Sequence, residues 1–302
     1  MNAMIAPAPS ARYRIAHTTL YRYSTPVAIC HNQLRMLPRA WNGVQIHSSE
    51  VDISPTPTWR AAHTDYYQNK VLTFAIESLH TELKVSVVSD VTVNASPDLS
   101  AHPTEWKTVQ QAQACPVDDV TLAASEYRYE SPMVIVSAPL ADYARPSFDK
   151  FPRFMDALTD LTKRIHADFR YDTRATNVTT KADEAFQLRA GVCQDFAHVQ
   201  IGCLRSLGFA ARYVSGYLRT IPKEGEEKLV GADESHAWLS VYGGPELGWV
   251  DCDPTNACLV YTDHIPICIG RDYRDVSPMR GVAIGGGRTS LSVSVDVSTV
   301  ES

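Results

Sequence analysis

The first hundred residues alternate between apolar and polar side chains, and this pattern restricts them to extended strands. In the segment ELKVSVVSDVTVN, residues 82–94, apolar side chains share one face and polar side chains the other, with Val88 the exception. The apolar set is Leu83, Val85, Val87, Val91 and Val93. A period of two residues is typical of an antiparallel strand with one buried face. Because residues 13–23 and 71–78 alternate in the same way, with prolines and polar clusters between them, we predict an N-terminal antiparallel β-sandwich domain over residues 1–100.

Two amphipathic helices are predicted in the second half of the chain, after a connector. Residues 101–150 contain prolines at short intervals and are expected to form a connector with short helices. Residues 151–169 carry apolar side chains at the spacing of a helix. A second helix is predicted to begin at Cys193 and to end at Gly208, because glycine is common just past a helix C-terminus.

Strand-like segments follow the second helix, at residues 211–218, 236–242 and 248–254. The last segment, residues 290–300, again alternates between apolar and polar side chains. We group all of these with the preceding helices into one unit, residues 151–302, in which the helix bearing the cysteine packs on an antiparallel sheet and C-terminal strands follow. The predicted fold class of the chain is therefore α+β.

Composition and charge argue against several kinds of partner. The 302 residues carry a net charge of −6 with no run of Lys or Arg, so a nucleic-acid partner is not expected. No stretch of about eighteen apolar residues occurs, so no membrane span or membrane partner is expected. The segment MNAMIAPAPSARYRI lacks the charged and apolar regions of a secretory signal. We therefore predict a cytoplasmic location, where disulfides rarely persist.

The seven cysteines are accordingly predicted to be free thiols: Cys30, Cys115, Cys193, Cys203, Cys252, Cys258 and Cys268. None of them belongs to a C-x-x-C pair, which argues against a zinc ribbon. The sequence also lacks the spacing of an EF-hand calcium loop. We predict that the protein requires no metal ion and no organic cofactor.

Cys193 stands where a helix begins, in the segment GVCQDF, two residues after Gly191. Unsatisfied backbone N–H groups and the positive end of the helix dipole favour a thiolate at such a position. Cysteine is also a common core residue, so the position alone leaves packing and nucleophilic catalysis both open.

A nucleophilic thiol needs a base, and the base needs an acceptor that fixes its tautomer. His236 lies at the start of a strand in SHAW, and Asp253 ends a strand in GWVDCDPTN, where Pro254 stops the pairing. Asp251 lies two residues earlier and projects from the same strand face, so it is a second candidate for orienting the histidine. Together with Cys193 these residues supply every part of a Cys–His–Asp triad.

Three segments together closely resemble the core of the transglutaminase-like superfamily, which has a papain-like cysteine protease fold: GVCQDFAHVQIGCLRSLGFAARYVSGYL, SHAWLSVY and GWVDCDPTN. The segment YRIAHTTLYRYSTPVAICHNQLRMLPR resembles the β-rich domain that precedes this core in the bacterial branch, and HIPICIGRDYRDVSPMRG resembles the end of that branch's core. The resemblance covers nearly the whole chain. It implies that Cys193 is the nucleophile, His236 the base and Asp253 its orienting partner.

The tetrahedral intermediate of such a reaction also needs hydrogen-bond donors for its oxyanion. The backbone N–H of Cys193 is the first candidate. The resemblance places an aromatic donor in the segment FRYD, where Tyr171 has the hydroxyl; the alternative for Tyr171 is a core aromatic. Gln187 precedes the cysteine by six residues but is expected on an exposed helix face. Asp195 is interpreted as a helix cap, and His198 as a packed histidine.

The resemblance implies a cysteine-nucleophile hydrolase that acts on peptide or amide bonds of a peptide or protein substrate through an acyl-thioester. The alternatives are a transglutaminase, which is a protein-glutamine amine acyltransferase, and a non-catalytic binding or scaffold protein. Hydrolysis is favoured over amine transfer because transfer needs a site that excludes water. FRYD offers no tryptophan for such a passage, and residues 219–235 contain no aromatic side chain. The sequence does not indicate an oligomeric state.

Overall fold

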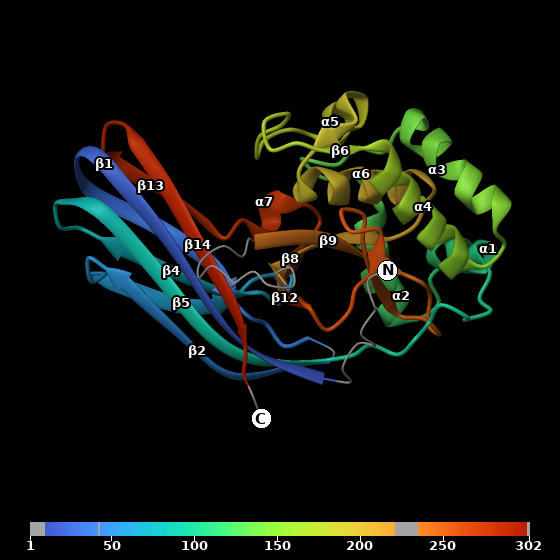
Figure 1. The fold of residues 1–302 in the computed structure, drawn as a ribbon, viewed down its shortest axis with the longest axis horizontal. Helices are drawn as coiled ribbons and strands as arrows, with labels where there is room; N and C mark the ends of the chain where they lie inside the picture. Colours follow the sequence, from blue (N-terminus) through green and yellow to red (C-terminus); the bar gives the residue numbers. More distant parts are fainter. Residues whose placement is uncertain (1–9, 42, 221–234, 301–302) are drawn as a thin grey trace, which may run out of the picture.

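The protein consists of a β-rich part and a helical part that lie side by side (Figure 1). The computed structural model describes residues 10–41, 43–220 and 235–300. The predicted α+β class is confirmed, with an antiparallel β-rich part at the N-terminus and a helix packed on an antiparallel sheet after it. Among the described residues, no helix has both the length and the apolar character needed to cross a membrane.

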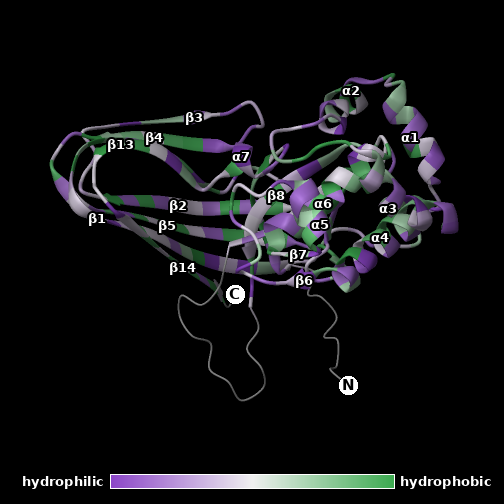
Figure 2. Cartoon of the chain, turned by 90° about the horizontal axis from the view of Figure 1, so that it is seen from above, coloured by the Kyte–Doolittle hydropathy of each residue, from purple (hydrophilic) through white to green (hydrophobic). Residues whose placement is uncertain are grey.

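A single long strand, β1, organises the β-rich part. Its first half pairs with β5 and β14, and its second half pairs with β4 and β13. β2 pairs with β5, and β3 pairs with β4. The strands are β1 (Ser10–Leu37), β2 (Val44–Ser54), β3 (Trp59–Thr64), β4 (Lys70–Ile76), β5 (His80–Asn94), β13 (Met279–Gly285) and β14 (Thr289–Thr299). Figure 2 shows the two resulting layers, so the sandwich is one antiparallel sheet that curls on itself.

β1 changes its partners near Pro26. The register between β1 and β5 shifts between Arg22 and Val27, and proline has no N–H to donate to a neighbouring strand. Apolar side chains fill the space between the layers: Val27, Cys30, Leu34, Met36, Ile53, Leu72, Phe74, Ile76, Leu83, Val85 and Val87. The buried face predicted for residues 82–94 supplies three of these.

The two C-terminal strands belong to the β-rich part, although the sequence groups them with residues 151–302. β13 and β14 both pair with β1. The alternation over residues 290–300 correctly predicts a strand, and its buried side chains Val295 and Val297 face the core. Alternation does not specify a partner, because any strand with one buried face offers the same backbone groups. The helical part therefore ends before β13.

The helical part is built on a five-stranded antiparallel sheet with the order β11-β10-β9-β8-β12. Its strands are β8 (Ala211–Leu218), β9 (Ser235–Tyr242), β10 (Trp249–Asp253), β11 (Cys258–Leu259) and β12 (His264–Gly270). Its helices are α1 (Trp106–Ala114), α2 (Asp119–Ser125), η1 (Glu126–Arg128), α3 (Ala138–Lys150), α4 (Phe154–Asp168), α5 (Ala182–Leu188), α6 (Cys193–Ser206) and α7 (Tyr273–Val276). A short parallel pair, β6 (Arg170–Tyr171) and β7 (Ala190–Gly191), precedes α6.

The central helix α6 lies between the sheet and the helices α3, α4 and α5 (Figure 1). Every residue from Gln194 to Arg205 is buried, which accounts for the lack of a polar face in this stretch. The helix ends at Ser206, and Gly208 just past it has a φ of +85°, as predicted for a glycine at a helix C-terminus. This packing holds the N-terminus of α6, and with it Cys193, against the start of β9.

Arg205 joins the end of α6 to its surroundings and is only 2% exposed. Its guanidinium donates hydrogen bonds to the carbonyls of Ala211 and Arg271 and to the hydroxyl of Ser131.

Arg205→Leu leaves these acceptors unpaired, so the free energy of unfolding should fall by about 3 kcal/mol in urea denaturation. Arg174→Leu is the control, because Arg174 is exposed and should change stability by less than about 0.5 kcal/mol. Equal effects of the two variants would contradict this role.

Candidate active site

Cys193 begins α6, and a cap holds the helix N-terminus beside it. The Oδ2 atom of Asp195 accepts hydrogen bonds from the N–H of Val192 at 2.8 Å and from the hydroxyl of Thr176 at 2.6 Å. A side chain at position 191 would collide with this carboxylate, so the cap requires Gly191. Burial raises the pKa of Asp195. The interpretation of Asp195 as a cap is confirmed, and Cys193 itself is partly exposed.

His236 lies near the start of β9, and its ring contacts two of the predicted catalytic side chains. Its Nε2 atom lies 2.7 Å from Oδ2 of Asp253. Burial lowers the pKa of His236, but the hydrogen bond to Asp253 and the interaction with the Cys193 side chain outweigh burial and raise it to about 10. The structure therefore brings Cys193, His236 and Asp253 together, in surroundings that favour the protonated imidazole.

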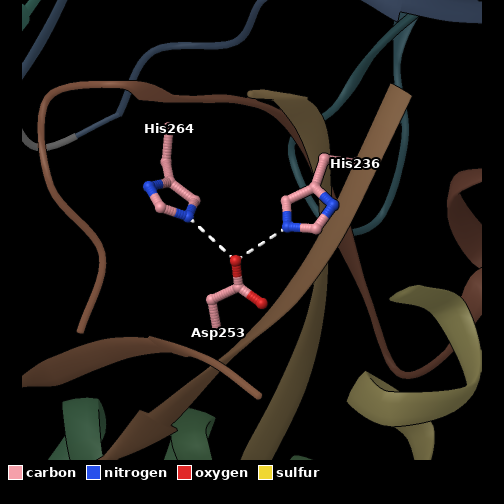
Figure 3. Close-up of side chains that lie close together, drawn as sticks. All are labelled: His236, Asp253 and His264. Atoms are coloured by element: carbon pink, nitrogen blue, oxygen red, sulfur yellow. Dashed lines mark hydrogen bonds and ion pairs between the residues drawn. The ribbon is translucent and has the colours of Figure 1, made fainter. Parts of the chain in front are cut away.

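Asp253 is a buried carboxylate with hydrogen-bond donors on both oxygens. Figure 3 shows the two bonds from histidine, which meet at one oxygen. Oδ2 accepts from Nε2 of His236, from Nε2 of His264 at 3.1 Å and from the side-chain amide of Asn256 at 2.6 Å. Oδ1 accepts from the backbone N–H groups of Thr255 at 2.8 Å and Asn256 at 3.3 Å. Burial raises the pKa of Asp253, but the two histidines outweigh it and hold the pKa well below its usual range. Asp253 is therefore ionised although it is shielded from solvent.

Asp251, the second candidate for orienting the histidine, has different neighbours. Its Oδ2 atom lies 3.4 Å from Nε1 of Trp238. It lines a cavity of about 740 Å³ together with Arg212 and Trp249. Burial raises the pKa of Asp251. Of the two aspartates, the structure places Asp253 at the histidine ring.

Tyr171 lies beside the start of α6. The pairing of β6 with β7 sets Tyr171 opposite Gly191, two residues before the cysteine, and 48% of Tyr171 is exposed. Its use as an oxyanion donor stays a prediction. Gln187 is exposed on α5, as expected. His198 is buried in α6, where its Nε2 atom accepts a backbone N–H at 3.1 Å, so its interpretation as a packed histidine is confirmed.

Two further side chains, Asn256 and His264, contact Asp253 and were not predicted from the sequence. Asn256 follows Asp253 by three residues, and the turn segment DPTN was the signal for it. His264 is the first residue of β12. The one sequence feature that points to it is a histidine at the start of a strand, a feature that it shares with His236 in SHAW. The sequence does not reveal that β12 lies next to β8, and so it cannot place this ring.

His236, Asp253 and His264 also offer three possible metal-ligand atoms within 4.8 Å of one another. Ligands bound to zinc at about 2.0–2.2 Å would lie roughly 3.3 Å apart in a tetrahedral site. The 2.7 Å between Nε2 of His236 and Oδ2 of Asp253 is instead the distance of a direct hydrogen bond. The cluster fits a hydrogen-bonded arrangement better than a zinc site.

Two families match the chain in sequence. The bacterial transglutaminase-like N-terminal region matches residues 13–92, and the transglutaminase-like superfamily core matches residues 144–254. An uncharacterized protein of Mycobacterium tuberculosis is 36% identical over 295 residues, which are 96% of this chain and 93% of that protein. A protein-glutamine gamma-glutamyltransferase of Pseudomonas aeruginosa is 34% identical over 119 residues, which cover 38% of this chain and 17% of that protein.

A solved structure shares the fold. A proposed cysteine protease from Cytophaga hutchinsonii superimposes with a TM-score of 0.77 at 17% identity, over 98% of this chain and 93% of that one. Both sequence families occur here in the order of the β-rich part and the helical part, and the mycobacterial relative spans both. The chain therefore belongs to the transglutaminase-like superfamily, in the bacterial branch that carries an N-terminal β-rich region.

Proposed function

We propose that this protein is a cysteine-nucleophile hydrolase that cleaves a peptide or amide bond in a peptide or protein substrate. The observation that carries the proposal is the His236 ring, which interacts with the Cys193 side chain while Asp253 holds its Nε2 atom. A base held between a thiol and a carboxylate is the arrangement that activates a nucleophilic cysteine. The fold shared with a proposed cysteine protease supports the same chemistry.

In the first half-reaction the Cys193 thiolate attacks the amide carbonyl carbon and forms a carbon–sulfur bond. The carbonyl electron pair moves to oxygen, where the N–H of Cys193 donates a hydrogen bond, because the first N–H groups of a helix have no acceptor within it. The Tyr171 hydroxyl is the proposed second donor. When the intermediate collapses, the carbon–nitrogen bond breaks, and the His236 imidazolium gives its proton to the leaving amine.

In the second half-reaction water resolves the acyl-thioester. The neutral His236 ring takes a proton from water as the oxygen attacks the thioester carbonyl. The carbon–sulfur bond then breaks, the electron pair returns to Cys193 as the thiolate, and the carboxylic acid leaves. Each atom and proton is supplied by substrate, water and these side chains, so the reaction requires no metal ion and no organic cofactor.

Removing the nucleophile or the base tests the mechanism. Cys193→Ala should abolish turnover and acyl trapping, and His236→Ala should lower turnover by about 10³ or more, because the members of a triad act as a unit. Cleavage of a peptide library would be followed by mass spectrometry, with circular dichroism to verify folding. Cys115→Ala, at an exposed cysteine outside the site, should behave as wild type. Near-normal turnover by Cys193→Ala would refute the mechanism.

The two aspartates of β10 form a matched pair for testing the orienting residue. Asp253→Asn should lower turnover by at least about 10², because an amide at this position favours the wrong tautomer of His236. Asp251→Asn should lower it by less than about threefold, because Asp251 contacts Trp238 instead. Steady-state rates of both variants on one substrate decide the point. A larger loss in Asp251→Asn would reverse the assignment.

The first alternative is amine transfer to a protein glutamine, the activity in the name of the Pseudomonas relative. Phe169 is buried and Tyr171 is half exposed in the segment FRYD, which has no tryptophan to line a passage for an amine. Residues 219–235 contain no aromatic side chain either, and residues 221–234 of them lie outside the part that the structure describes. We propose hydrolysis because water is the default acceptor of an open acyl-enzyme.

A partition experiment separates the two acceptors. A preformed acyl-enzyme on Cys193, presented with water and a millimolar primary amine, should yield mainly the carboxylic acid, because the segment FRYD has no tryptophan to line a passage that favours the amine. Mass spectrometry of both products gives the ratio. Predominantly amide product would show that the protein is an acyltransferase, and it would leave the roles of Cys193 and His236 unchanged.

The second alternative is a binding or scaffold protein that keeps the fold without catalysis. Alkylation rates distinguish it, because a scaffold would alkylate at Cys193 no faster than at the exposed Cys115.

The cytoplasmic location and the absence of nucleic-acid and membrane partners stay predictions that accompany the proposed hydrolase.

A further inference from the structure

We propose that His264 is a positioning residue, which acts from β12 to fix the Asp253 carboxylate so that one oxygen is aimed at His236. The inference rests on the proposed function, in which His236 is the base. Figure 3 shows both imidazoles directing Nε2 at the same oxygen, Oδ2, over distances of 2.7 Å for His236 and 3.1 Å for His264. His264 thus adds a fourth side chain to the proposed triad.

The hydrogens at this oxygen can be assigned by chemistry. An ionised carboxylate only accepts, so both imidazoles must donate through Nε2. At His264 the other ring nitrogen, Nδ1, is buried and has no hydrogen-bond partner among the described residues. A ring with both nitrogens buried and unpaired would cost stability. The bond from Nε2 to Asp253 is therefore the polar contact that favours this orientation of the His264 ring. Asp253 therefore fixes the tautomer of His264, and His264 in turn holds Asp253.

Packing across the sheet holds the His264 ring in place. The indole of Trp238 meets this ring edge-on, with centroids 5.3 Å apart and an interplanar angle of 81°. Trp238 reaches His264 across β8 at Gly216, where a Cβ atom would collide with the indole and with the carbonyl of Ile265 on β12. His264 is 4% exposed. The aromatic contact and the close approach at Gly216 align β12 with the proposed triad.

The other donors to Asp253 cannot replace His264. Thr255 and Asn256 follow Asp253 directly in the same turn, so they fix the carboxylate relative to that turn and move with it. Asn256 is also exposed, where water competes for its amide. Among the described residues, His236 and His264 alone donate to Asp253 from other strands. His264 is therefore the contact that fixes Asp253 relative to the sheet independently of His236.

The loss of this contact has a definite consequence for pH dependence. The described titratable groups that face Asp253 are His236, His264 and the thiols of Cys252 and Cys258. Burial, with Asp253 nearby, raises the pKa of Cys258 to about 12, and burial also raises that of Cys252, so both thiols stay neutral. The two imidazoles lower the pKa of Asp253. Without His264 that pKa should rise, so the ionised carboxylate would be lost at a higher pH as the solution is acidified.

Two amide variants test the position of the donor. In His264→Gln the amide nitrogen can stand where Nε2 stands, whereas in His264→Asn it can reach only the place of Nδ1. In His264→Asn we expect the acid limb of the pH profile for Cys193 alkylation by iodoacetamide to move up by about one unit, so that the rate on that limb falls about tenfold. In His264→Gln the limb should stay in place and the rate should stay within about threefold of wild type. Equal behaviour of the two variants would overturn the proposal.

A control and a second measurement separate this inference from the proposed function. His17→Asn also changes a buried histidine, one that contacts Tyr217, and should leave the acid limb in place. In Cys193→Ala protein, the ¹³C signal of the Asp253 carboxyl should titrate at higher pH with His264→Asn but not with His264→Gln. If wild-type Cys193 reacts no faster than Cys115, the proposed function fails while this titration still decides the role of His264. An unmoved titration would refute the positioning role alone.

Discussion

The structure of the site depends on one constraint, a carboxylate that is ionised and yet shielded from water. A buried charge is costly unless hydrogen bonds replace its hydration. Asp253 meets this requirement with donors from its own turn and from His236 and His264. The two histidines reach it only because β9 and β12 flank β8 and because Gly216 admits Trp238 between them. The order of the sheet is therefore part of the chemistry of the site.

This constraint also gives the β-rich part a structural role that the sequence leaves open. β12 is one of the two outer strands of the five-stranded sheet, and an uncovered edge strand tends to pair with other chains. The side chain of Asn69 binds the backbone N–H and C=O of Ile269 on β12, at 2.9 and 2.7 Å. The hydroxyl of Tyr13 donates to Asp263 at 2.9 Å, immediately before His264. The β-rich part thus covers and braces the strand that carries the second histidine.

Local chemistry in this protein could be predicted from the sequence, whereas assembly across strands could not. The start of α6 at Cys193 and the end of β10 at Asp253 follow from a glycine before the helix and a proline after the strand, which act on their nearest neighbours. The contact of His264 depends on strand order, which long-range packing decides. The same limit applies to residues 290–300, whose alternation predicts a strand but not its pairing with β1.

The hydrogen bonds at Asp253 also determine where the proton of the reaction resides. Oδ2 accepts from His236, His264 and Asn256, and the two histidines hold the pKa of Asp253 well below its usual range, so the carboxylate does not take the proton of His236. The carboxylate keeps its charge and stabilises the imidazolium, which is consistent with the raised pKa of about 10 for His236. A general acid must hold its proton at the operating pH until the leaving group takes it. An imidazolium that Asp253 stabilises in this way supplies the proton that the amine leaving group needs when a peptide or amide bond breaks.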